Sequence, residues 1–177
     1  KDSHRAVLLL VKAVENTGAS AEIDAWLGIA YAKEGKLDLA VLASESAIRK
    51  NPKTIQGYKN LCTIYREMKR PKDWLDAIKQ AKGIQNTSAE FLVELSGMYF
   101  DYAAVHPGEA KAYRPRVRDL LDAAQELEPV ETGVQLKLMN ALERSGDFVA
   151  AAEVGEMALG GTPKNFMLRR KVADLFY

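Results

Sequence analysis

Few side chains in this sequence have the types and the spacing that catalysis needs. The two histidines, His4 and His106, lie far apart in the chain, and Cys62 is the single cysteine. We find no glycine-rich phosphate loop, no paired histidines or cysteines at metal-ligand spacing, and no serine nucleophile elbow. Aspartates and glutamates are numerous but scattered over positions expected to face solvent. The sequence therefore predicts a protein that is not an enzyme, with no metal site and no cofactor.

Two cations, Lys59 and Arg66, form the most suggestive charged pair. They are seven residues apart, which places both on one face of a helix and two turns from each other. This arrangement suits a partner segment that carries carboxylates beside an apolar anchor. The alternative is that Lys59 pairs with a neighbouring acid and contributes little to binding.

Composition excludes several classes of partner. Lys plus Arg number 25 against 24 for Asp plus Glu, a formal net charge of +1, whereas a nucleic-acid binder usually has a clear basic excess. Basic clusters at residues 69–72, 114–118 and 169–171 are interpreted as solvated helix surface. The longest apolar run, residues 6–11, is far shorter than the ~20 residues of a membrane span. We therefore expect neither a nucleic acid nor a membrane span.

A period of 34 residues runs through the chain. The residues that keep this spacing are Leu27, Leu61 and Leu95, Tyr31, Tyr65 and Tyr99, and Ala13, Ala47 and Ala81. A fixed period of this size indicates one supersecondary unit that is repeated, with each copy burying an apolar face of its neighbour.

The first complete unit resembles the tetratricopeptide repeat. Its pattern residues are Leu27, Gly28, Tyr31, Gly35, Ala40, Ala47 and Pro52. The resemblance implies an all-α fold, a right-handed α-solenoid of about ten helices stacked as antiparallel pairs. The leading tryptophan of the family is absent from every unit.

The whole chain, residues 1–177, is expected to form a single array of such units. The predicted complete units are residues 21–54, 55–88, 89–131 and 132–165. Residues 1–20 match the second helix of a unit whose first helix is absent, and residues 166–177 match a first helix with no second. We interpret the chain as an excerpt of a longer array or of a multidomain protein.

The third unit is nine residues longer than the others. The additional residues are placed at 106–114, between a first helix ending near Val105 and a second helix starting at Pro115, because a Pro-Gly pair at 107–108 breaks helices. Such insertions often lie on a binding face, although a tolerated surface loop is the alternative. Tyr102, His106 and Tyr113 are the candidate contacts around it.

The resemblance also implies which residues line the concave groove of the solenoid. These are Ala25, Ile29, Lys59, Thr63, Arg66, Val93, Phe100, Leu136 and Asn140. Phe100 and Tyr102 are candidate aromatic anchors that could instead pack under the insertion. A carboxylate clamp of the kind that grips chaperone C-termini is absent in this register, since Asn60 alone matches it.

We therefore predict a non-catalytic scaffold that binds a peptide or protein segment in the concave groove. The partner would be acidic with an apolar anchor. One alternative is a structural element that self-associates end to end through its half-units as a homo-oligomer. Another is the interaction arm of a larger multidomain protein. The compartment and the partner's identity stay open.

Overall fold

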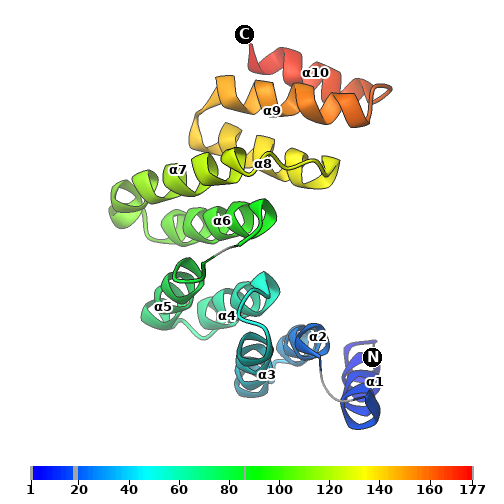
Figure 1. Ribbon diagram of the computed structural model, residues 1–177. Helices are drawn as coiled ribbons and strands as arrows, with labels where there is room; N and C mark the ends of the chain where they lie inside the picture. Colours follow the sequence, from blue (N-terminus) through cyan, green and yellow to red (C-terminus); the bar gives the residue numbers. More distant parts are fainter. Residues whose placement is uncertain (1, 18–19, 86, 177) are drawn as a thin grey trace. The chain divides into compact units, whose positions relative to one another are not determined.

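The protein is built from α-helices. Figure 1 shows the computed structural model, which describes residues 2–17, 20–85 and 87–176. In these residues there is no strand. The elements in chain order are α1 (Asp2–Thr17), α2 (Ala21–Lys33), α3 (Leu37–Lys50), α4 (Ile55–Glu67), α5 (Pro71–Lys82), α6 (Ala89–Val105), the 3-10 turn η1 (Pro107–Glu109), α7 (Ala110–Glu126), α8 (Thr132–Ser145), α9 (Phe148–Gly161) and α10 (Phe166–Leu175). The predicted all-α fold with about ten helices is confirmed.

The chain divides into two compact units, Lys1–Gln85 and Asn86–Tyr177. In the first unit, α2 packs on α3 and α4 on α5, and α4 also contacts α2 and α3. In the second unit, α6 packs on α7 and α8 on α9, and α8 also contacts α6 and α7. Each neighbouring pair of helices therefore repeats one arrangement. We name α2, α4, α6, α8 and α10 the first helices, and α1, α3, α5, α7 and α9 the second helices.

The helix ends follow from local residue chemistry. Ser20 and Ser88 accept hydrogen bonds from the backbone N–H of Ile23 and Phe91, at 3.3 and 3.2 Å, and so begin α2 and α6. Gly35 has φ +71° after α2, a left-handed conformation that glycine adopts without strain. Lys69 stands 34 residues later in the same conformation, with φ 56°. The first and second helices are thus separated by the same tight turn in both pairs of the first unit.

The insertion differs from the sequence-based expectation because most of it is helical. α7 begins at Ala110, so Pro115 lies inside this helix and not at its first turn. α6 and α7 have 17 residues each, whereas α2 and α4 have 13. Four residues make about one helical turn. The additional residues therefore lengthen both helices of the pair, and the 3-10 turn η1 joins them.

Candidate functional site

In the first unit, the predicted groove residues lie on α2 and α4, which contact each other. Ala25 is buried, and Ile29 and Lys59 are half-buried. Thr63 and Arg66 are exposed, and the Arg66 guanidinium lies 6.0 Å from the centre of the Trp74 ring. Thr63, Arg66 and part of Ile29 and Lys59 thus remain available to a partner, while Ala25 serves helix packing.

In the second unit, ion pairs join the first helices to one another. Lys137 on α8 donates to Glu90 and Glu94 on α6 at 2.7 and 2.8 Å, and these hydrogen bonds raise the pKa of Lys137. Lys171 on α10 donates to Asn140 at 2.6 Å. Each of these charged groups is already paired across two first helices.

The predicted groove residues of the second unit lie among these pairs. Val93 is buried, Leu136 and Phe100 are half-buried, and Asn140 is exposed. Val93 therefore serves packing, and Asn140 presents an amide that already accepts from Lys171. Of this set, Phe100 offers the largest apolar surface to a ligand.

The elongated pair α6–α7 forms one wall of a groove in the second unit. Figure 1 shows the α6–α7 hairpin reaching past the turn between α8 and α9. The groove has a volume of about 1060 Å³ and lies between the end of α6, the first half of α7 and the α8–α9 turn at residues 142–148. Its size is that of a site for a small ligand or a short peptide segment. The insertion thus creates a concave surface that the shorter helix pairs lack.

An aromatic cluster supports the α7 side of the groove. Tyr113 packs against Tyr99 and Tyr102, with ring centres 5.5 and 5.6 Å apart, and His106 stacks on Tyr102 at 4.2 Å. Tyr102 and Tyr113 are buried. Of the three candidate insertion contacts, Tyr113 alone lines the groove, while Tyr102 and His106 hold it in place. Aromatic packing of this kind fixes the additional turns of both helices.

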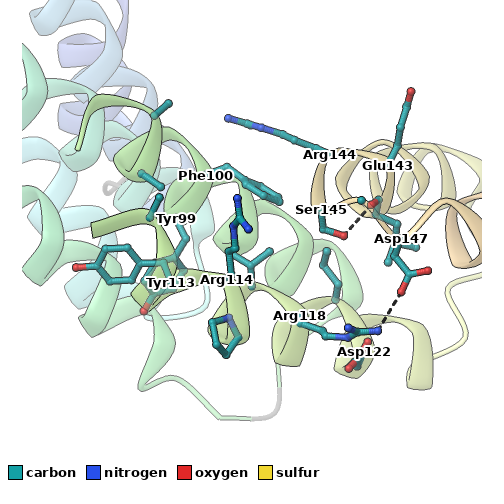
Figure 2. A pocket seen from close by; sticks show the side chains of 18 of the residues that line it. Tyr99, Phe100, Tyr113, Arg114, Arg118, Asp122, Glu143, Arg144, Ser145 and Asp147 are labelled. Atoms are coloured by element: carbon teal, nitrogen blue, oxygen red, sulfur yellow. Dashed lines mark hydrogen bonds and ion pairs between the residues drawn. The ribbon is translucent and has the colours of Figure 1, made fainter. Parts of the chain in front are cut away.

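Three arginines and three acids surround the groove. Arg118 pairs with Asp147 at 3.4 Å, and Arg144 pairs with Asp101 at 3.2 Å and covers the Phe100 ring at 4.6 Å. Arg114 also lines the groove, and Figure 2 shows it pointing from α7 toward Phe100. Among the described residues, Arg114 has no carboxylate partner within 4.0 Å. It is therefore the cation best placed to pair with an incoming carboxylate.

Tyr113 makes the wall sensitive to high pH. Burial of its ring, followed by the hydrogen bond that its hydroxyl donates to Glu109 at 2.8 Å, raises the pKa of Tyr113 to about 12. An unfolded chain ionises its tyrosines near pH 10. The folded state thus keeps this phenol neutral where the unfolded state has lost the proton. Its contribution to stability is complete below about pH 10 and is lost as the pH rises toward about 12.

We expect the free energy of unfolding to fall more steeply between pH 9.5 and 11.5 for the native protein than for Tyr113→Phe. The difference accumulated over this range should reach at most about 3 kcal/mol, since one pKa unit corresponds to about 1.4 kcal/mol. Urea unfolding followed by circular dichroism at several pH values measures both slopes. The other tyrosines are common to both proteins, so equal slopes would contradict this account.

Several groove residues were not among the sequence-based candidates. Arg114 and Arg118 belong to the basic cluster at 114–118 that the sequence analysis assigns to solvated surface, and Asp147 and Phe148 lie at the α8–α9 turn. Arg114 and Arg118 are four residues apart, the spacing that puts two side chains on one helix face, and this was the available signal. The α8–α9 turn carries no such signal, because its approach to α7 depends on tertiary packing.

The described residues contain no helix that is both long enough and apolar enough to cross a membrane. Within the same residues, no group of three or more histidine, cysteine, aspartate or glutamate side chains could hold a metal ion.

Comparison with known proteins gives matches to solved structures. No family model and no curated protein matches the sequence. The fold is similar to that of a thermophilic TPR protein from Thermus thermophilus, with a TM-score of 0.60 and 20% identity over 98% of this chain and 90% of that one. A tetratricopeptide repeat protein from Parabacteroides merdae has a TM-score of 0.53 and 17% identity over 99% and 66%. PilF from Pseudomonas aeruginosa has a TM-score of 0.51 and 18% identity over 99% and 77%. At these identities the likeness shows the fold alone.

Proposed function

We propose, on the premise that this chain has the tetratricopeptide-repeat fold, that it is a non-catalytic scaffold that binds a segment of a partner protein. Paired helices give a rigid surface before the partner arrives, so little conformational entropy is lost on binding. The observation that carries the proposal is the groove of about 1060 Å³ between α6, α7 and the α8–α9 turn.

The chemistry of the groove supports a partner segment with an apolar anchor beside an acidic side chain. Phe100 is half-buried and Phe148 is exposed, and both line the groove, so an apolar side chain can remove their surface from water. Arg114 can form a charge-assisted hydrogen bond to a carboxylate at the same place. The remaining arginines are engaged by Asp147 and Asp101 and keep the groove walls in register.

The face of α2 and α4 that carries Lys59 and Arg66 is a second surface for the same class of partner. Arg66 is exposed and stacks near Trp74, an arrangement that orients its guanidinium. This face lies in the first unit and has no comparable concavity among the described residues, so the proposal places the main docking site in the second unit.

Selection from a library of random peptides displayed on phage tests the proposal while the partner is still unidentified. We expect the selected peptides to share an Asp or Glu near an aromatic or large aliphatic residue. Arg114→Glu should weaken binding of a selected peptide by at least about tenfold in calorimetry, or 1.4 kcal/mol, because it places a like charge against the carboxylate. The affinity of the native protein should also fall as salt increases.

Two matched variants separate the possible outcomes. Arg49→Glu reverses an exposed arginine on α3 in the first unit and should leave binding unchanged. Arg66→Glu tests the α2–α4 face directly. A loss with Arg66→Glu but not with Arg114→Glu would move the docking site to the first unit, and peptides without acidic residues would refute the proposed chemistry.

A further inference from the structure

The two ends of the chain present helix faces that are covered in the rest of the molecule. We number residues within a repeat from position 1, which is Ala21 in the first complete unit, Ile55 in the second, Ala89 in the third, Thr132 in the fourth and Phe166 in α10. Second-helix positions of the third unit are shifted by its nine additional residues. Equivalent positions can then be compared for burial.

Position 23 shows which face of α1 is uncovered. It is Ala43, Ala77, Leu120 and Val154 in the four second helices that pack on a first helix of their own unit, and these side chains are at most 9% exposed. The equivalent residue of α1 is Leu9, which is 61% exposed. α1 does contact α2, the next first helix. The exposure of Leu9 therefore marks the place of a first helix that would precede α2.

Position 6 points to the same place from α2. Asn60 donates to the carbonyl of Ala25 at 2.7 Å, Lys137 donates to Glu90 at 2.7 Å, and Lys171 donates to Asn140 at 2.6 Å. Each of these position-6 residues thus reaches the preceding first helix.

The position-6 residue of the first complete unit is Trp26, which is 59% exposed. No first helix precedes α2 among the described residues. Leu9 and Trp26 therefore border one uncovered site that has the dimensions of a helix. Large exposed apolar residues that gather at one site mark an interaction surface.

α10 is uncovered on the opposite kind of face. It packs on α9 through Leu168 and Val172, which are both buried. Positions 8 and 11 are Ser96 and Tyr99 in α6 and Met139 and Leu142 in α8, all buried in helix pairs that have a second helix. On α10 the same positions are Ala173 and Phe176, and both are exposed. This face is the one that a second helix covers.

The two uncovered faces complement each other. α1 is a second helix that lacks its first helix, and α10 is a first helix that lacks its second. A complete unit crosses where residues are small, as at Gly28, Ala40 and Ala47, at positions 8, 20 and 27. The two chain ends supply Ala173, Ala6 and Ala13 at these same positions. We infer that α10 of one copy packs between Leu9 and Trp26 of a second copy and completes a repeat unit across the two chains.

The expected contacts follow from the repeat. A residue at position 6 meets positions 2 and 5 of the preceding first helix, as Lys137 and Asn60 do with Glu90 and Ala25. Trp26 would therefore meet Met167 and Arg170 of the other copy, and both are exposed in the single chain. Sulfur–aromatic and cation–π contacts favour these partners for an indole ring. Because the contact uses different surfaces on the two copies, each added copy leaves one end of each kind open.

Sedimentation velocity of the full chain over a series from micromolar to millimolar concentration tests this inference. We expect the average mass to rise with concentration for the native protein. Trp26→Glu and Phe176→Glu should each remain monomeric over the range, because each buries a charge at one side of the contact. An equimolar mixture of the two variants should form a one-to-one dimer and nothing larger, since one intact end of each kind remains.

Controls keep the result independent of folding and of the proposed groove. Leu42→Glu replaces a side chain as exposed as Trp26, at 58% against 59%, but on the outer face of α3, and should assemble like the native protein. Leu9→Glu should repeat the effect of Trp26→Glu, and far-UV circular dichroism should be unchanged in all variants. All variants should still bind peptides selected on the native chain. A monomer at every concentration, or a mixture that does not form a dimer, would overturn the inference and leave these faces to a helix of another protein.

Discussion

Leu138→Ala should lower the free energy of unfolding by about 2–5 kcal/mol, the range for removing a large aliphatic side chain from a packed core. Leu138 is fully buried on α8, at the position of the repeated leucine of each unit. The loss combines the transfer of apolar surface and the cavity that remains, because neighbouring helices cannot close a space of this size. Urea unfolding measured by circular dichroism gives the value.

The matched control is the same substitution at an equivalent position. Leu27 occupies this position on α2, where it is half-buried. Leu27→Ala removes the same atoms but less buried surface, so its loss should be clearly smaller. Both variants are measured at low concentration, where any association of chain ends is absent. Equal losses at the two positions would show that burial within these helix pairs does not determine stability as described.

The period of 34 residues was sufficient to predict the fold because it constrains every helix pair at once. Leucines and tyrosines at fixed spacing must face the same neighbours in each copy, so a single assignment determines all of them. The structure places these residues on the first helices, with Leu61, Leu95 and Leu138 buried. No single residue carries this information, which is why one missing tryptophan in each unit did not mislead.

The position of that missing tryptophan is filled in ways that the sequence does not predict. On α2 it is Asp24, which is 4% exposed and accepts hydrogen bonds from Ser46 and Lys50 on α3, both at 2.6 Å. A buried carboxylate is tolerated only when such partners are present. They lie 22 and 26 residues away, so only the packing of α2 on α3 brings them to Asp24.

The insertion was misjudged because a local signal competed with a tertiary one. Pro107 and Gly108 do interrupt the helix, but residues 110–114 resume it five residues before the expected start at Pro115. Ala110, Lys111 and Ala112 favour helix, and Tyr113 is buried against Tyr102. A proline in the second turn removes one backbone hydrogen bond. Burial of the aromatic ring offsets that loss, and the groove depends on this exchange.

The fourth unit shows how a repeat can lose its glycine and still pack closely. Position 8 is Gly28 in the first complete unit and Met139 in the fourth, while position 24 on the second helix is Ser44 in the former and Gly155 in the latter. A Cβ on Gly155 would lie 3.0 Å from the Met139 sulfur and 2.5 Å from a methyl group of Val172. The small residue has therefore moved from one helix to the other, which a search for glycine at one position misses.

Gly28→Ala should destabilise the first unit by about 1–3 kcal/mol, the usual range for overpacking a close helix contact. The new Cβ would lie 2.5 Å from the Ser44 hydroxyl oxygen and 3.3 Å from the side-chain nitrogen of Asn60. Both groups donate hydrogen bonds, Ser44 to the carbonyl of Ala40 and Asn60 to that of Ala25, each at 2.7 Å. Moving either group away leaves a buried polar atom poorly satisfied, a further destabilising contribution.

Gly97→Ala is the control, because it makes the same change inside α6 where no atom lies within 4 Å of the new Cβ. In an open helix position alanine is favoured over glycine by up to about 1 kcal/mol. The same substitution should therefore lower the free energy of unfolding at residue 28 and raise it at residue 97, both measured in urea. A gain at both positions would mean that α2 and α3 can separate without loss, and the close approach at Gly28 would then not hold the first unit together.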